Sequence, residues 1–308
     1  MRPRPPDPAR RAVTRLAPAK VNLALHVTGR RADGYHEIDT LVGFAGIADR
    51  LSAAPADTIE MIATGPFAGL IDGPPQANLV ARAARLLAGA ARSAGSTPGG
   101  ARLTLEKNLP VAAGLGGGSA DAAAALAALI ELWRLPPHLG LGAIAAALGA
   151  DVAMCLQSLP LRARGIGERI ERFAGARRLD AILVNPRVAL PTSAVFAALT
   201  HRSSPPIPAL PADPFDPDFL ADLRNDLEAP AARLAPVIAD VLALLSRQPG
   251  CRLARMSGSG ATCFALFDDA AAAARAHRSV IDIAPQWWSV PTEIGGSPPP
   301  AGAGPAAR

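Results

Sequence analysis

A glycine-rich segment in the middle of the chain has the composition of an anion-binding loop. It runs from Pro110 to Ser119, and glycine fills four of the five positions from 114 to 118. Glycine lets the backbone turn and approach a ligand without interference from a Cβ atom. The alanine-rich sequence after it predicts a helix over 119–133, whose first turn offers free N–H groups and a positive dipole end. The segment therefore predicts a phosphate site, and a flexible entry to the helix is the alternative.

Two common nucleotide-binding motifs do not describe this loop. No Gly-Lys-Ser or Gly-Lys-Thr sequence follows it, as a P-loop requires, and the dinucleotide fingerprint GxGxxG fails at Ser119. Ser119 can cap the following helix, or its hydroxyl can contact a phosphate or a metal ion.

A lysine near the N-terminus is the second candidate. Of the 31 Lys and Arg residues only Lys20 and Lys107 are lysine, which suggests that lysine is kept where a compact ammonium is needed and singles out Lys20. Residues 21–27 alternate and predict a strand. The alternation places two sets of side chains on opposite faces: Lys20, Asn22, Ala24 and His26 on one, and Val21, Leu23, Leu25 and Val27 on the other. Lys20 and Asn22 can then converge on one ligand, or they are incidental polar groups on an exposed face.

An aspartate follows the helix predicted over 142–148. Asp151, in the sequence Gly-Ala-Asp-Val, would ordinarily be a turn or cap residue. The functional alternative is a carboxylate that accepts a hydroxyl proton during phosphoryl transfer.

A predicted hairpin turn carries the only tyrosine of the chain. Asp33-Gly34 is a common turn sequence, and it joins the strand over 21–27 to an apolar run over 38–44. Tyr35 and His36 follow it, and a flat ring beside a hydrogen-bonding imidazole suits a heterocyclic base. No second histidine lies at ligand spacing from His36, so the pattern does not predict a metal site.

A Gly/Ser turn lies between two further predicted strands, over 251–256 and 262–267. Its sequence, Ser257-Gly258-Ser259-Gly260, is either a plain hairpin or a second set of backbone amides for a charged substrate.

The remaining pattern predicts a mixed α+β fold. Helices are expected over 78–91, 219–227 and 231–246, and strands over 101–106 and 181–184. The two ends of the chain, 1–11 and 293–308, are Pro- and Gly-rich or basic tails that cannot build a core.

Composition limits the class of protein. Half the residues are hydrophobic, the net charge is +5 and the pI is near 9.8. The positive charge keeps a nucleic-acid-binding module open as an alternative, although the arginines crowd the N-terminal tail. No uninterrupted apolar run of membrane-spanning length and no apolar stretch of secretory type occurs. Three cysteines without CxxC spacing favour a reducing cytoplasm over disulfides or zinc.

Taken together, these segments resemble one family. PVAAGLGGGSADAAAAL resembles the second motif, and MSGSGATCFALF the third motif, of the GHMP (galacto-, homoserine, mevalonate and phosphomevalonate) kinases. APAKVNLALHVTGRRADGYHEIDTL paired with GADVAMCLQ resembles the members that act on a cytidylated sugar alcohol. The similarity extends from about residue 14 to about residue 290.

The resemblance implies a two-domain fold. An N-terminal ATP-binding domain of ribosomal-S5-like topology would occupy 12–162, and a ferredoxin-like C-terminal domain would occupy 163–292. The active site would lie between them.

The resemblance also implies a reaction. The γ-phosphate of ATP, bound with Mg²⁺, would pass to the 2-hydroxyl of 4-diphosphocytidyl-2-C-methyl-D-erythritol, in the non-mevalonate (MEP) route to isoprenoid precursors. Asp151 would be the base and Lys20 would polarise the Asp151–hydroxyl pair. Asn22, Tyr35, His36 and Phe196 would bind the substrate, with His36 reading the cytosine edge between two aromatic walls. The triphosphate would lie on Pro110, Val111, Ala112, Ala113, Gly114, Leu115, Gly116, Gly117, Gly118 and Ser119. No metal ligand is assigned.

Further expectations concern partners and alternatives. A cytoplasmic monomer or weak homodimer is expected, with a small-molecule substrate and neither nucleic acid nor membrane as a partner. The alternative within the family is a kinase for mevalonate or homoserine. Tyr35, His36 and Phe196 discriminate, because a substrate without a nucleobase needs no aromatic clamp.

Overall fold

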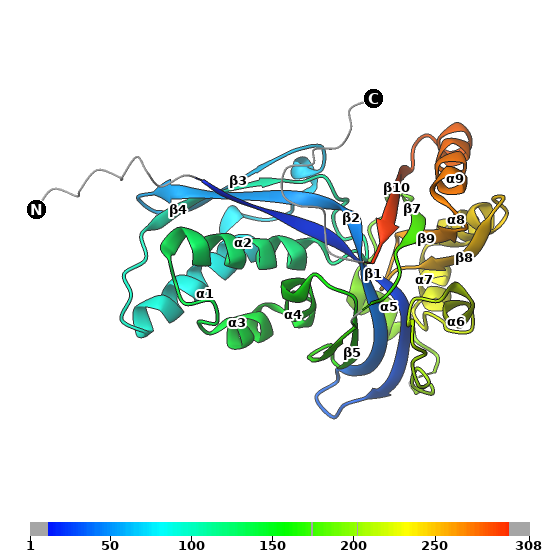
Figure 1. The fold of residues 1–308 in the computed structure, drawn as a ribbon, viewed down its shortest axis with the longest axis horizontal. Helices are drawn as coiled ribbons and strands as arrows, with labels where there is room; N and C mark the ends of the chain where they lie inside the picture. The colour runs from blue at the N-terminus through cyan, green and yellow to red at the C-terminus, as the bar shows by residue number, and fades with distance from the viewer. Residues whose placement is uncertain (1–11, 174, 202, 296–308) are drawn as a thin grey trace, which may run out of the picture.

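The fold was examined in a computed structural model, which describes residues 12–173, 175–201 and 203–295. Within these ranges the strands join one sheet, in the order β3-β4-β2-β10-β7-β9-β8; off this path, β1 and β5 pair with β2, and β6 pairs with β5 (Figure 1). The strands are β1 (Val13–Arg30), β2 (His36–Ala56), β3 (Ile59–Thr64), β4 (Gly100–Glu106), β5 (Leu161–Gly165), β6 (Arg169–Arg172), β7 (Leu179–Asn185), β8 (Cys251–Met256), β9 (Cys263–Phe267) and β10 (Trp288–Ile294).

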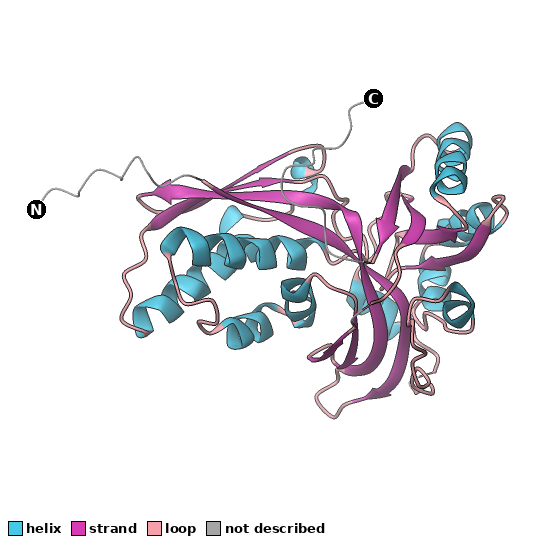
Figure 2. Cartoon of the chain, in the orientation of Figure 1, coloured by secondary structure: helices cyan, strands magenta, loops and turns pink. Residues whose placement is uncertain are grey.

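The helices divide between two layers (Figure 2). The α-helices are α1 (Leu79–Ser93), α2 (Gly117–Trp133), α3 (Leu141–Leu148), α4 (Ala150–Gln157), α5 (Thr192–Ala197), α6 (Pro217–Ala221), α7 (Glu228–Leu234), α8 (Val237–Ser246) and α9 (Ala270–Ile283). Two short 3₁₀ helices, η1 (Ala68–Leu70) and η2 (Pro75–Ala77), precede α1.

The first layer is built on the long antiparallel pair of β1 and β2. Helices α1 to α4 lie on one side of this pair in Figure 1. Alanine and leucine side chains from α1 and α2 pack with β2 and β4 in one hydrophobic cluster, where small alanines let helices and sheet approach closely. Helix α1 begins at Leu79 because the Asn78 side chain accepts the Val80 N–H at 2.9 Å, an N-cap contact.

The second layer contains β7 to β10 with α7 to α9. Leu245 and Val280, among others, pack from its helices into a second cluster. Strand β10 pairs with β7 along its length and reaches β2 at the single pair Ile294–Ala45. The strands of the two layers thus meet at one pair, and a third hydrophobic cluster, which includes Val21 and Leu23 of β1 with Leu183 of β7 and Phe264 of β9, packs between the layers.

The predicted single alternation along β1 is wrong. The pairing of β1 with β2 shifts register between Asn22 and Ala24 and again between Val27 and Gly29. A bulge changes the face that following side chains occupy. Val21 and Leu23 accordingly pack in one cluster, and Leu25 and Val27 in another. His26 does not share a ligand with Lys20, because its ring nitrogens meet the Pro205 carbonyl and the Arg224 N–H.

Other element predictions hold to different degrees. The helices expected over 78–91, 119–133 and 142–148 appear as α1, α2 and α3 with ends within two residues. The helix expected over 231–246 is broken near Pro236 into α7 and α8, because proline has no N–H to continue the ladder. The helix expected over 219–227 ends at Ala221, and Asn225 instead forms a bridge with Leu25 of β1.

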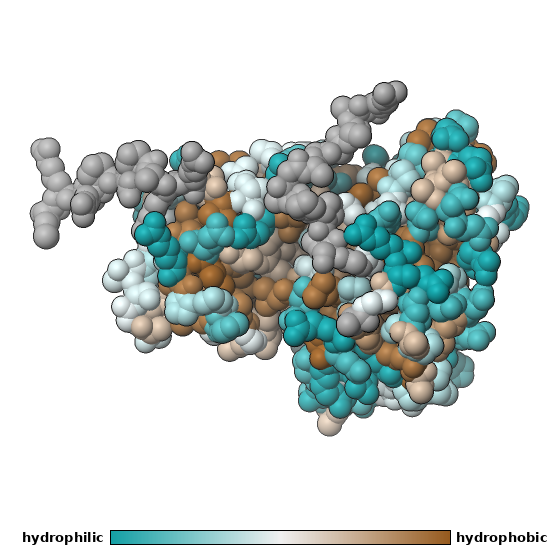
Figure 3. Space-filling model, viewed as in Figure 1, coloured by the Kyte–Doolittle hydropathy of each residue, from teal (hydrophilic) through white to brown (hydrophobic). Residues whose placement is uncertain are grey.

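The surface differs between the layers. In the view of Figure 3, hydrophilic side chains cover much of the C-terminal layer, while hydrophobic atoms gather over the helices of the N-terminal layer. None of the helices in the described ranges has the length and apolar character needed to cross a membrane.

Candidate active site

The ammonium of Lys20 is the centre of the candidate site. The residue is only 4% exposed, and its Nζ donates to Asn22 Oδ1 at 2.8 Å and lies 3.3 Å from Asp151 Oδ2. The Asn22 amide is fixed in turn, because its Nδ2 donates to Thr40 Oγ1 at 2.8 Å and Thr40 donates to the Ala24 carbonyl. The predicted convergence of Lys20, Asn22 and Asp151 is therefore present in the structure.

Asp151 reaches this site from the first turn of α4. The expectation that it lies just past a helix is incomplete: Gly149, at φ 139°, ends α3 and begins α4, and Asp151 is the second residue of α4. Its side chain remains 41% exposed, whereas that of Lys20 is 5% exposed. One side of this carboxylate thus faces the lysine and the other is open to a ligand.

The glycine loop lies against the same lysine. The Lys20 N–H donates to the Leu115 carbonyl at 2.9 Å, and a Cβ on Gly116 would lie 2.8 Å from Lys20 Cε. Gly114 and Gly116 have φ of 74° and 60°, a region that favours glycine. The expected cap at Ser119 is wrong: Gly116 is the N-cap of α2, and Ser119, which is half-buried, lies in the first turn of that helix. The first-turn amides of α2 therefore have no side-chain cap.

The Gly/Ser turn between β8 and β9 braces the glycine loop. Ser257 accepts the Asn22 N–H at 3.1 Å and donates to the Gly114 carbonyl at 3.0 Å. The Thr262 N–H donates to the Ala113 carbonyl at 3.1 Å, and a Cβ on Gly114 would collide with the Ser257 carbonyl. Segments of both layers thus hold the loop next to Lys20.

Three supporting residues were not assigned to the site from the sequence. Thr40 orients Asn22, Ser257 joins Asn22 to the loop, and Asn225 holds the turn after β8 by donating to the carbonyls of Met256 and Gly258, both at 2.8 Å. Ser257 lay in a predicted motif, but nothing in the local sequence indicated Thr40.

The aromatic residues gather at the end of the β1–β2 hairpin. The rings of His36, on β2, and Phe196, on α5, stack with centroids 4.9 Å apart and planes 25° apart. Tyr35 lies in the turn before β2 and is 63% exposed. The structure thus brings His36 and Phe196 together, while Tyr35 projects into solvent beside them.

A cysteine near the Lys20–Asp151 pair is not a candidate nucleophile. Cys155 lies one helical turn after Asp151 on α4 and is buried. Burial and the nearby Asp151 carboxylate raise the pKa of its thiol, so the reactive thiolate is disfavoured.

No preformed metal centre accompanies the site. Across the described ranges, no group of three or more His, Cys, Asp or Glu side chains could hold an ion. The oxygen donors around the loop, the half-buried Ser119 hydroxyl and the half-exposed Asp151 carboxylate, fit a Mg²⁺ ion that keeps most of its ligands as phosphate oxygens and water.

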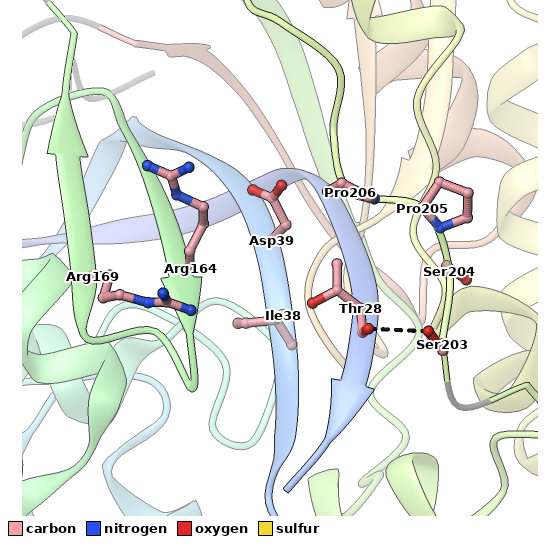
Figure 4. Close-up of a pocket in the computed structure, with 9 residues that line it drawn as sticks. All are labelled: Thr28, Ile38, Asp39, Arg164, Arg169, Ser203, Ser204, Pro205 and Pro206. Carbon is pink, nitrogen blue, oxygen red and sulfur yellow. Dashed lines mark hydrogen bonds between the residues drawn. The ribbon is translucent and has the colours of Figure 1, made fainter.

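A cavity of about 500 Å³ lies elsewhere, beside the hairpin (Figure 4). It is lined by residues of β1, β2, β5, β6 and the connection before α6: Thr28, Ile38, Asp39, Arg164, Arg169, Ser203, Ser204, Pro205 and Pro206. It includes neither Lys20 nor the glycine loop, so it is separate from the candidate active site.

Comparison with known proteins agrees with this geometry. The model of the GHMP kinases N terminal domain matches residues 78–158, and that of the GHMP kinases C terminal domain matches 217–284. The 4-diphosphocytidyl-2-C-methyl-D-erythritol kinase of Cereibacter sphaeroides is 48% identical over 91% of this chain and 99% of that protein. The enzyme of the same name from Methylobacterium radiotolerans is 51% identical over 90% of this chain and 97% of that protein.

Solved structures give the same result. A crystal structure of 4-(cytidine 5'-diphospho)-2C-methyl-D-erythritol kinase, 36% identical, covers 92% of this chain and all of that one with a TM-score of 0.75. Homoserine kinase from Cytophaga hutchinsonii, at 18% identity and a TM-score of 0.69, shares the fold.

Fold and site together define a GHMP kinase, an ATP-dependent phosphotransferase. Within that superfamily, the chain belongs to the family of 4-diphosphocytidyl-2-C-methyl-D-erythritol kinases. The predicted two-domain α+β fold and the predicted family are thereby confirmed. The predicted boundary between residues 162 and 163 falls inside β5, and the domain limits stay a prediction.

Proposed function

We propose that the chain transfers the γ-phosphate of ATP to the 2-hydroxyl of 4-diphosphocytidyl-2-C-methyl-D-erythritol. The observation that carries the proposal is the Lys20–Asp151 pair, 3.3 Å apart, at the edge of the glycine loop. A tertiary alcohol is a poor nucleophile, so it needs a carboxylate to accept its proton and a fixed position in line with the phosphate. The residues that can meet these two requirements, Asp151, Lys20 and the glycine loop, lie together at this site.

Each polar residue then has a distinct role. Asp151 accepts the hydroxyl proton through the side that is open to solvent. Lys20 holds the carboxylate and stabilises negative charge that develops on the transferred phosphoryl group. Asn22 keeps the ammonium in place through its 2.8 Å contact. The uncapped amides at the start of α2 receive the phosphates, because a helix N-terminus attracts anions.

The nucleobase is assigned to the aromatic end of the hairpin. His36 supplies hydrogen-bonding nitrogens beside the ring of Phe196, and Tyr35 has the exposure needed to close over a base. This arrangement favours the cytidylated substrate over mevalonate and homoserine, which carry no base to stack.

Four further parts of the proposal concern the surroundings of the reaction. The Ser119 hydroxyl would be the protein oxygen that holds a Mg²⁺ ion bound with ATP, and the ion would supply positive charge next to the phosphates. The enzyme acts in the cytoplasm, as a monomer or weak homodimer, on a small molecule and without nucleic acid.

A coupled kinase assay tests the substrate assignment. The purified chain is supplied with MgATP and, in parallel, the cytidylated methylerythritol, mevalonate or homoserine. We expect ADP release with the first substrate at a kcat/KM at least about 100-fold above the other two, because only that substrate engages the aromatic residues. Equal turnover of mevalonate or homoserine would refute the assignment.

A further inference from the structure

The second lysine of the chain lies at the centre of a sealed ion cluster under the glycine loop. The Lys107 ammonium donates to Asp49 on β2 and, at 2.8 Å, to Asp121 on α2. The three residues are 3%, 0% and 2% exposed. Because no ligand atom can reach them, this cluster (Lys107, Asp49 and Asp121) can act only through the atoms packed on it.

The cluster holds both ends of the phosphate loop. Asp49 Oδ1 accepts the N–H groups of Asn108, at 2.5 Å, and Leu109, at 2.8 Å, directly before the loop begins. Asp121 lies on α2, two residues beyond the end of the loop. One carboxylate therefore fixes the entry of the loop and the other its exit, and Lys107 joins the two carboxylates.

The ammonium also touches the loop itself. A Cβ on Gly117 would lie 3.0 Å from Lys107 Nζ and 3.8 Å from Asp49 Oδ2. Gly117 is the first residue of α2, where the backbone N–H groups have no helical partner. The ammonium thus limits how closely the Gly117 backbone can approach the cluster. The larger guanidinium of arginine would not fit in the same space.

The charges of the cluster are unequal. Burial alone would lower the pKa of Lys107, but Asp121 and Asp49 outweigh it and raise that pKa, so the lysine stays charged. Asp49 is satisfied by the ammonium and two N–H groups, whereas Asp121 Oδ1 is buried without a hydrogen-bond partner. One cation thus has to serve two buried carboxylates, and Asp121 is the carboxylate that remains partly unsatisfied.

We propose that Lys107 is a positioning residue for phosphoryl transfer: through Asp49 and Asp121 it fixes the entry and exit of the glycine loop, so that the first-turn amides of α2 face the ATP phosphates at a set spacing. The inference rests on the proposed function in that ATP is taken as the ligand of this loop. A buried ion cluster that serves folding alone would leave ATP affinity untouched once the protein is folded.

The test removes the link between the two ends of the loop. Lys107→Met alone leaves two uncompensated carboxylates and is expected to destabilise the fold severely. The double variant Lys107→Met/Asp121→Asn removes one charge of each sign, and Asp49 keeps its two backbone donors. Isothermal titration with MgATP should show a Kd at least about 10-fold weaker than that of the unaltered chain. The Kd for the cytidylated substrate should change less than about twofold, because the residues proposed to bind that substrate, Asp151, His36 and Phe196, lie outside the loop's entry and exit.

A matched control separates positioning from stability. Asp39 and Arg162 form another buried, bidentate pair, at 2.8 and 2.6 Å, between β2 and β5. Asp39→Asn/Arg162→Met should lower the melting temperature in the same way and leave the Kd for MgATP unchanged. Equal ATP affinity in the two double variants would overturn the positioning role.

Two further outcomes are decisive. If Lys107→Met/Asp121→Asn does not fold, Asp121→Asn alone is titrated: about threefold weaker MgATP binding supports the inference, and unchanged binding overturns it. An unaltered chain that binds no MgATP would instead refute the proposed function, which keeps the two failures distinct.

Discussion

The two lysines of this chain lie on the same phosphate loop but in opposite surroundings. Lys20 is buried against an amide and faces one carboxylate, Asp151, whose side chain is 41% exposed. Lys107 is enclosed by two carboxylates with side chains 0% and 3% exposed. An ion pair that is open on one side can exchange a partner for substrate, whereas a sealed pair can only hold neighbouring atoms in place. The comparison teaches that exposure of the partner, rather than burial of the lysine, separates the catalytic role proposed for Lys20 from the positioning role proposed for Lys107.

The largest effect is expected at the open carboxylate. Asp151→Asn keeps the shape of the side chain but removes its basicity, so kcat should fall at least about 100-fold while the Kd for MgATP stays close to that of the unaltered chain. Steady-state kinetics and isothermal titration measure the two quantities. Asp240→Asn, on the exposed face of α8, is the control and should keep full activity. Turnover above a tenth of normal would remove Asp151 from the role of base.

A second experiment exchanges each lysine for arginine. Lys20→Arg should lower kcat about 10-fold or more with little change in melting temperature, because the longer side chain can turn toward the solvent beside Asp151. In Lys107→Arg the longer side chain cannot turn toward solvent, since Lys107 Nζ already lies against Gly117. Overpacking should therefore lower the melting temperature by about 5 °C. Thermal unfolding and kinetics of both variants, with the exposed Arg275→Lys on α9 as control, distinguish the two responses. Identical behaviour of the two variants would contradict the contrast between the sites.

The sequence predicts the local parts of this arrangement well. The glycine loop, the helix after it and the β1–β2 hairpin each depend on neighbouring residues, and their patterns are visible within about 20 positions. Phe196 entered the site only through the family resemblance, which also decided for Asp151 between a turn residue and a proton acceptor, because a single aspartate or phenylalanine carries no pattern of its own.

The sealed cluster could not be predicted, and the reason is physical. Lys107 meets Asp49 across 58 positions of sequence and Asp121 across 14, and both contacts follow from how β2, β4 and α2 pack. The rarity of lysine was the one available signal, and it marked Lys107 as clearly as Lys20. The bulges of β1 were missed for a similar reason, because they result from pairing with β2 and leave the apolar alternation intact.

A smaller effect is expected at the aromatic end of the hairpin. His36→Ala or Phe196→Leu should raise KM for the cytidylated substrate about 10-fold and leave the KM for ATP unchanged, because this stacked pair is where the proposed function places the nucleobase. Initial rates at varied concentrations of each substrate measure this split. His138→Ala, at an exposed position, is the matched control. An unchanged KM for the cytidylated substrate in both variants would place the base elsewhere.

The smallest effect concerns the charge state of the sealed cluster. Burial raises the pKa of Asp121 from 3.8 to about 7, against the opposing pull of Lys107 and with the support of Asp49. Between these two pH values the folded state holds a proton that the unfolded chain has released, so this residue's contribution to stability falls as the pH rises toward 7 and is constant above it.

Asp121→Asn removes that titration and leaves the other ionisable groups in place. The melting temperature of the unaltered chain minus that of the variant should therefore decrease between about pH 5 and about pH 7, and then level off. Differential scanning fluorimetry of both proteins across this range measures the difference, in which the titration of groups they share cancels. A difference independent of pH would mean that Asp121 stays ionised throughout. Lys107 would then lie between two ionised carboxylates. The buried cluster would keep a net negative charge instead of neutralising it by protonation of Asp121.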